Sequence, residues 1–255
     1  VNNITYTGFP RGIGYFNGTR SNIGIDEGVL LTSGWVRYAI GPNNSEDMTY
    51  PALAPGDPDL SNLVNYFTLD AAVLEFDFVP FQDTVRFEYV FGSEEYEEFV
   101  GSVYNDVFAF FISGPGFSGK QNIALIPGTN IPVAINNVNH LRNTQYYINN
   151  AMGQTVQYDG FTTVLEAVAP VVPCQTYHLK LAIADVSDNL LDSGVFLKSG
   201  SFDAGSMYSV VGLRDAVENG CQPGIIEIQR LGNLNDSVTV FFHIQGNATN
   251  GVDYT

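Results

Sequence analysis

Acidic and amide side chains gather in two loops, each next to a stretch with a strand-like pattern. The first loop lies between residues 85–91 and 107–112, and the second follows residues 177–184. Their oxygen-bearing side chains are Glu94, Glu95, Asn105 and Asp106 in the first loop and Asp185, Asp188 and Asp192 in the second. Carboxylates held this close repel one another unless water or a cation compensates them. The pattern predicts either a cation site or solvated acidic loops that cap strands.

If a cation binds, the ligand types favour Ca²⁺. This ion accepts about six to eight oxygen ligands from carboxylates, amides and backbone carbonyls in irregular loops, whereas Mg²⁺ demands a stricter geometry. Neither loop contains His or Cys, so Zn²⁺ is not expected. The spacing does not match the continuous loop of an EF-hand. We expect the two loops to converge and to hold Ca²⁺.

The sequence evidence for a catalytic site is weaker than that for a cation site. Glu95 paired with Asp106 or Asp188 could act as acid and base on a glycosidic bond. A jelly-roll hydrolase usually lines its cleft with several Trp side chains, however, and this sequence has only Trp35. The three histidines lie on separate predicted elements, and neither an HExxH nor a G-x-S-x-G motif is present. We therefore expect no enzymatic activity, and a glycan-processing enzyme is the alternative.

Alternating apolar and polar residues predict the strands that position the two loops. The alternation recurs over residues 74–78, 85–91, 179–183 and 238–244, and no segment keeps a helical period. Residues 107–112 are apolar on both faces, as in a strand inside a sandwich. A turn at Gln82-Asp83 is expected to join 74–78 and 85–91 as an antiparallel pair. The predicted fold class is all-β, a jelly-roll-like β-sandwich.

Weaker patterns predict the remaining local structure. Residues 1–35 read as two or three short strands, and residues 123–126 as another strand closed by a turn. Residues 59–63 are expected to form one helical turn, capped by Asp57 or Asp59. The amide-rich residues 129–157 are expected to form an ordered surface loop that hydrogen-bonds its own backbone.

Composition limits the classes of partner. The 255 residues carry 27 acidic against 10 basic side chains, a net charge of −17. Binding to a phosphate backbone is therefore a poor prospect, and we expect no nucleic-acid partner. No apolar run reaches the length of a membrane-spanning helix, so no membrane span is expected.

Several short motifs, in order along the chain, resemble the choice-of-anchor L domain family. They are FGSEEY at 91–96, NDVF at 105–108, FISGPG at 111–116, NIALIPGT at 122–129, YDGFT at 158–162, IADVSD at 183–188 and DSGVFL at 192–197. The blocks cover most of residues 1–203, which we take as the first domain. The family is found in bacterial surface and secreted proteins with varied C-terminal sorting signals, and the resemblance implies no enzymatic activity.

The resemblance also implies a setting and a function. Members of this kind are similar to large surface adhesins of Bacteroidota that are exported by the type IX secretion system, including gliding-motility adhesins. We therefore expect an extracellular, cell-surface, non-catalytic module for cell adhesion or for binding a surface or glycan ligand, with Ca²⁺-stabilised acidic loops. The secretion or gliding machinery is an expected partner during export. A purely structural spacer of a surface filament is a further alternative.

The C-terminal part of the chain is expected to open a second sandwich. Residues 204–220 read as a linker, and residues 221–255 resemble the first half of a Calx-beta-like module, so we expect the full-length protein to continue. The exported setting implied by the resemblance is oxidising. Cys174 and Cys221 then form one bridge or remain two thiols.

Overall fold

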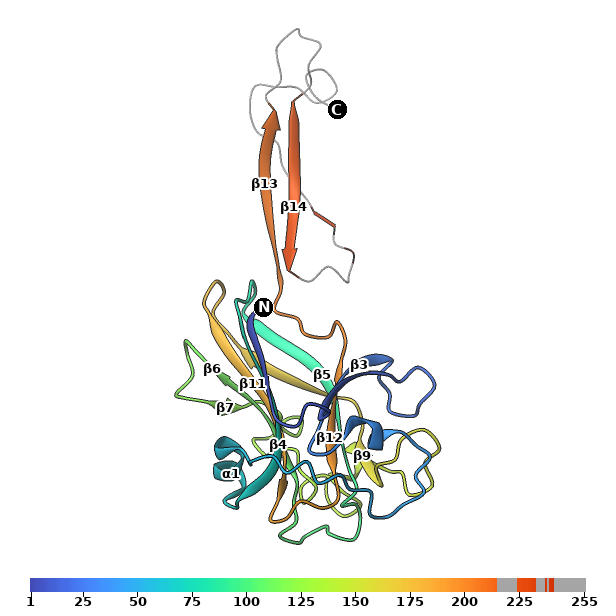
Figure 1. The fold of residues 1–255 in the computed structure, drawn as a ribbon. Helices are drawn as coiled ribbons and strands as arrows, with labels where there is room; N and C mark the ends of the chain where they lie inside the picture. Colours follow the sequence, from blue (N-terminus) through green and yellow to red (C-terminus); the bar gives the residue numbers. More distant parts are fainter. Residues whose placement is uncertain (215–223, 233–236, 238, 241–255) are drawn as a thin grey trace.

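The structure is a computed structural model that describes residues 1–214, 224–232, 237, 239 and 240, and these residues are nearly all β (Figure 1). Within them, two antiparallel sheets form a sandwich. The first sheet, in spatial order, contains β1 (Asn2–Thr7), β4 (Thr68–Phe78), β11 (Tyr177–Val186), β6 (Val107–Ser113) and β7 (Gln121–Asn122). The second contains β2 (Ile13–Asn17), β3 (Glu27–Thr32), β12 (Ser193–Lys198), β5 (Thr84–Ser93), β9 (Gly160–Thr162) and β8 (Tyr147–Asn149), and β10 (Leu165–Pro170) also pairs with β5. The all-β prediction is confirmed.

Inward-facing side chains of β5, β6 and β11 fill the space between the sheets. Phe91 of β5 stacks on Phe108 of β6 with ring centroids 4.9 Å apart, and Tyr89 meets Phe110 edge to face at 4.9 Å. All four rings are fully buried. These contacts explain why alternate residues of β5 are apolar, while β6, covered on both faces, is apolar throughout. The core therefore fixes the strand ends from which both acidic loops emerge.

The expected pairing of residues 74–78 with 85–91 is wrong. β4 lies between β1 and β11 in the first sheet, whereas β5 lies in the second sheet beside β12 and β9. The chain between them crosses from one sheet to the other, and its Phe81 N–H donates to the Ala204 carbonyl at 2.6 Å. Two strands that face each other across a core carry the same alternation as two neighbours in one sheet, so the pattern alone did not distinguish the arrangements.

Shorter elements differ partly from expectation. Helix α1 (Pro58–Val64) is capped by the Asp57 side chain, as predicted, and the chain also forms 3₁₀ turns η1 (Val36–Ala39) and η2 (Thr144–Tyr146). Residues 123–126 are irregular beyond β7, so the expected strand is wrong there. In the amide-rich segment, Asn139 Nδ2 does donate to the Ile135 carbonyl at 2.8 Å. The segment is not confined to the surface, however, because Val133, Ile135 and Val138 belong to the core.

A separate hairpin follows the sandwich (Figure 1). β13 (Ser206–Arg214) pairs antiparallel with β14 (Ile225–Gly232). β13 therefore occupies residues 206–214 of the segment 204–220, which the sequence predicts as a linker; the division into domains stays a prediction. Cys221 and most of the expected strand 238–244 lie outside the described residues. Cys174 is exposed, and both its pairing and the Calx-beta-like module stay predictions.

Candidate metal centre

In the first sheet, strand register brings carboxylates of the two acidic loops together. Ala184 of β11 pairs with Val107 of β6. Continued by one residue, this antiparallel register sets Asp185 opposite Asp106. Both side chains are buried, and Asp106 is the charged neighbour that perturbs Asp185 most. The prediction that the loops converge is thus met for this pair.

In the second sheet, the ends of three adjacent strands bring together a second row of acidic residues, the first row being Asp106 and Asp185. Ser93 of β5 pairs with Ser193 of β12 on one side and with Gly160 of β9 on the other. One residue further along, Glu94 therefore lies between Asp192 and Asp159. The Glu94 N–H donates to the Asp192 carbonyl at 3.2 Å, as this register requires.

Serine hydroxyls connect the two rows. Ser193 Oγ lies 2.7 Å from Asp106 Oδ2 and 2.8 Å from Ser93 Oγ, both within hydrogen-bond distance. The other oxygen of Asp106, Oδ1, accepts from the Val186 N–H at 3.0 Å. Asp106 is therefore held in place between the sheets, with both oxygens engaged.

Several buried oxygens at this end have no hydrogen-bond partner among the described residues. They are both carboxylate oxygens of Glu94, both of Asp185, Oε2 of Glu95 and Oδ2 of Asp159. Glu94, Glu95 and Asp185 are each only 1% exposed. A buried carboxylate without a partner is costly in its charged form. The acidic rows therefore need compensation by a proton or by a cation.

The pKa values of these carboxyl groups are raised, which means that the buried site favours their protonated, uncharged forms. Burial, with the charges of Asp159 and Asp192 adding to it, raises the pKa of Glu94 to about 9. Burial also raises the pKa of Asp192 to about 7 and that of Asp159 to about 6. The pKa values of Glu95 and Asp185 rise for the same reason, with the Asp106 charge as the next cause for each.

Backbone groups fix the position of Asp192. The Tyr50 N–H donates to both of its carboxylate oxygens, at 3.1 and 3.0 Å. Gly34 is required beside it, because a Cβ at this position would lie 1.8 Å from Asp192 Oδ2. Asp192 is therefore oriented by two segments that the metal prediction did not include.

The remaining predicted ligands sit at the edge of the cluster. Asp188 is half-buried, and its Oδ1 accepts from the Leu190 N–H at 3.1 Å. Asn105 Oδ1 accepts from the Asn136 N–H at 2.9 Å, which ties it to the amide-rich segment. Asp159 was missed. Its available sequence signal is its place in the YDGFT motif at residues 158–162.

An open cavity of about 980 Å³ adjoins the cluster. Its acidic lining residues are Glu46, Asp47, Glu95, Glu97, Glu98, Asp159 and Asp188, and its lining contains no Lys or Arg. Such a surface attracts cations. In the part of the chain that the structure describes, no group of three or more His, Cys, Asp or Glu side chains is already arranged as a metal site. A cation would therefore draw on shifted side chains, or on amide, hydroxyl and backbone oxygens, which Ca²⁺ accepts.

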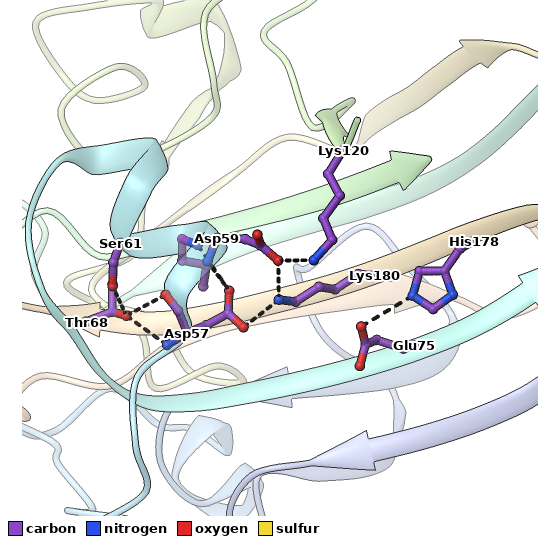
Figure 2. A network of polar contacts seen from close by, with 9 residues as sticks. Asp57, Asp59, Ser61, Thr68, Glu75, Lys120, His178 and Lys180 are labelled. Atoms are coloured by element: carbon purple, nitrogen blue, oxygen red, sulfur yellow. Dashed lines mark hydrogen bonds and ion pairs between the residues drawn. The ribbon is translucent and has the colours of Figure 1, made fainter. Parts of the chain in front are cut away.

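A second set of polar groups lies elsewhere, against α1 (Figure 2). Lys180 of β11 is 5% exposed, and its Nζ lies 2.5 Å from Asp57 Oδ2 and 2.7 Å from Asp59 Oδ2. Lys120 reaches Asp59 Oδ2 at 2.6 Å. The other Asp57 oxygen, Oδ1, caps α1 by accepting from Asp59 N and Leu60 N. We call Asp57, Asp59, Lys120 and Lys180 the lysine network.

Comparison with known proteins identifies one relationship. A family model described as "Choice-of-anchor L domain" matches residues 1–203, which include both acidic rows and the lysine network. Searches among curated proteins and solved structures find no match to the chain. None of the helices within the described ranges is long and apolar enough to span a membrane.

Proposed function

The chain belongs to the choice-of-anchor L domain family, a non-enzymatic, surface-anchor-type domain of surface-associated proteins, and we propose that it is an adhesion module whose acidic loops bind Ca²⁺. In this proposal the module acts at the bacterial cell surface and binds a surface or glycan ligand. The type IX export route and the gliding-motility setting are part of the proposal and rest on the resemblance of the sequence motifs to such adhesins.

The unpartnered carboxylate of Asp185 is the observation that carries the metal part of the proposal. Both of its oxygens are buried without a hydrogen bond of good geometry, opposite the buried Asp106. The Ser33 side chain lies near enough to lower the pKa of Asp185, but burial and the Asp106 charge still raise that pKa well above its usual value. Glu95 and Asp188 add further negative charge around Asp106. A divalent cation would replace the mutual repulsion of these groups by attraction, and their oxygen chemistry suits Ca²⁺.

The acidic cavity supports the binding part. It is lined by Glu95 and Asp188 of the same loops and combines them with amide side chains, including Asn43, Asn44 and Asn149. Ca²⁺ keeps exchangeable positions in its coordination sphere, and sugar hydroxyls can take such positions. A ligand held in this way would bind only while the metal is present.

The first experiment measures thermal unfolding of the full chain after removal of metal by a chelator. Ca²⁺ at 100 times its Kd should stabilise the folded state by about 2.7 kcal/mol. For a chain of this length that corresponds to a rise in Tm of roughly 5–10 °C. Asp185→Asn should abolish the rise, whereas Asp26→Asn, the same change at an exposed aspartate outside the cluster, should leave it intact. A Tm that does not respond to Ca²⁺ or chelator, with no metal found by elemental analysis, would overturn the metal proposal.

The second experiment tests adhesion. The purified chain is applied to a panel of immobilised polysaccharides in Ca²⁺ and again in chelator. Retention that requires Ca²⁺ and is lost in Asp185→Asn supports the adhesion module. Absence of binding to the panel and to bacterial and host cell surfaces would instead favour a structural spacer.

A further inference from the structure

We infer that Glu94 and Asp159 hold a second divalent cation, distinct from the one proposed at Asp106 and Asp185, on the cavity side of the second sheet. This inference rests on the proposed function, because it divides the acidic end into two sites for the same kind of ion. In this inference Asp159 and Glu94 are ligands of the second cation, and the other predicted ligands belong to the first.

Strand register places the two carboxylates side by side. Ser93 of β5 pairs with Gly160 of β9, so Glu94 and Asp159 are the next opposed residues where the two strands continue. Directly opposed residues of antiparallel chains have Cβ atoms about 4.5–5.5 Å apart and side chains on one face. The charge of Asp159 accordingly perturbs Glu94 more than any other charge does.

The free oxygens of this pair point to a ligand. Both oxygens of Glu94 and Oδ2 of Asp159 are buried without a hydrogen bond of good geometry, and the two residues are only 1% and 6% exposed. The Gln157 side chain and the Met48 N–H lie near enough to Glu94 to lower its pKa, but they do not offset its burial, which raises the pKa to about 9. Asp159 is nevertheless held firmly, because its Oδ1 accepts from Asn43 Nδ2 at 2.7 Å. Asn43 in turn donates to the Asn150 carbonyl at 3.0 Å. The pair thus offers three carboxylate oxygens, at most half of the about six to eight that Ca²⁺ requires.

One cation does not serve both acidic rows well. Asp185 and Asp106 belong to the first sheet and Glu94 and Asp159 to the second, and the Ser93 and Ser193 hydroxyls lie between them. Each row has its own carboxylate with two free oxygens, Asp185 in one and Glu94 in the other. A cation bound in one row would leave the buried carboxylate of the other row without a partner.

The cavity gives the second site a route to solvent. Asp159 and Asn43 both line it, although Glu94 does not. Coordination positions on the Asp159 side can therefore be filled by water from the cavity.

The test counts Ca²⁺ ions bound to the full chain by isothermal titration calorimetry and native mass spectrometry after chelation. Wild type should bind two. Asp159→Asn and Glu94→Gln should each weaken one site at least tenfold and leave the other, while Asp185→Asn should remove only the other. Asp26→Asn is the control and should still bind two. Circular dichroism of each variant establishes that it is folded, and Glu94→Gln provides an independent test if Asp159→Asn does not fold.

The outcomes separate the two proposals. One Ca²⁺ in wild type, unaffected by Asp159→Asn and Glu94→Gln but lost in Asp185→Asn, would overturn the second site and leave the proposed function standing. One Ca²⁺ lost in any of the three variants would mean a single shared site and would also overturn the inference. No Ca²⁺ in wild type would overturn both.

Discussion

Two groups of buried carboxylates in the same sandwich are compensated in opposite ways. In the lysine network, Asp57 and Asp59 meet the ammonium group of Lys180 at 2.5 and 2.7 Å (Figure 2). At the acidic end, Glu94 and Asp185 have four buried oxygens between them without a hydrogen-bond partner in the described residues. One group carries its own cation, and the other does not.

The difference bears on what each group can do. Removing an ion from water costs several kcal/mol, and a nearby opposite charge offsets this cost only when the geometry is good. The lysine network meets that condition within the chain, so its contribution to stability needs nothing from solution. The acidic end must take up protons or cations, so its stability depends on the medium. Such dependence is the property expected of a binding site.

The largest expected effect comes from removing the internal cation. Lys180→Met keeps an apolar stem of similar length but leaves Asp57 buried without its partner. Breaking a buried ion pair in this way costs about 3–5 kcal/mol, which urea unfolding at neutral pH would measure.

Lys120→Met is the matched control for this substitution. Lys120 contacts the same Asp59, but its side chain is 46% exposed. An exposed pair contributes at most about 1 kcal/mol. If the two substitutions cost the same, burial does not determine the strength of the lysine network.

The next effect is the pH dependence of the metal-free protein. A carboxyl group whose pKa is raised by folding stabilises the protein fully below its unfolded pKa, near 4, and this contribution is lost as pH rises through the folded pKa. With the pKa of Asp192 at about 7 and that of Glu94 at about 9, stability in chelator should fall across this window. Each group removes up to about 1.4 kcal/mol per pH unit, so we expect roughly 2–3 kcal/mol from each of the two groups between about pH 5 and 7.

The measurement is the free energy of unfolding in urea at several pH values, with chelator and with Ca²⁺. Because Ca²⁺ and protons compete for the same oxygens, the stabilisation by Ca²⁺ should grow as pH rises. The lysine network should not contribute in this window. Burial lowers the pKa of Lys180, but Asp57 and Asp59 raise it above its usual value overall, so its contribution is lost only at strongly alkaline pH. Stability that rises from pH 5 to 8 in chelator would contradict this view of the acidic end.

The same substitution, Asp→Asn, should change the free energy of unfolding in opposite directions at two positions. In chelator, burial and the charges of Asp106 and Asp192 raise the pKa of Asp185 well above its usual value, so folding at neutral pH must protonate this carboxyl group. Asp185→Asn removes that cost, and we expect a gain of about 1 kcal/mol. Asp57→Asn removes the charge that pairs with Lys180, and we expect a loss of about 2 kcal/mol. Chelator-matched urea unfolding of both variants is the measurement. A loss at both positions would show that Asp185 is satisfied without metal.

Much of this arrangement follows from local sequence patterns. The alternation in residues 85–91 and 179–183 predicted β5 and β11, and the acidic runs after them predicted the loops at which Asp106 and Asp185 meet. The helical turn with Asp57 as its cap was also predictable, because a side-chain acceptor before Pro58 is a local signal. These features depend on residues close together in the chain.

The missing parts depend on which strands become neighbours. The pairing of β5 with β9 brings Asp159 to Glu94 over a long sequence separation, and nothing in the alternation of either strand specifies it. The misassigned partner of β4 has the same origin. The alternation in residues 179–183 places Lys180 on the opposite face of β11 from its apolar neighbours, yet α1 covers this face. Only the packing of α1 on β11 turns an outward lysine into a buried cation.

The smallest effect is expected at His178, two residues before Lys180 on β11. Residues two apart in a strand share a face, and both side chains contact carboxylates of neighbouring elements. His178 Nδ1 lies 2.8 Å from Asp77 Oδ1, and Nε2 lies 3.3 Å from Glu75 Oε1. Its side chain is 38% exposed, however, whereas that of Lys180 is 7% exposed.

His178→Gln should therefore change the free energy of unfolding by no more than about 0.5 kcal/mol, because water replaces the lost contacts and screens the charges. The variant is compared with Lys180→Met in the same urea series at neutral pH. A small effect beside a large one, on the same strand and the same face, would identify the cover provided by α1 as the cause of the difference. A loss at His178 as large as that at Lys180 would show that a half-exposed pair on this strand contributes as much as the covered one, and that cover by α1 is not the cause of the strength of the lysine network.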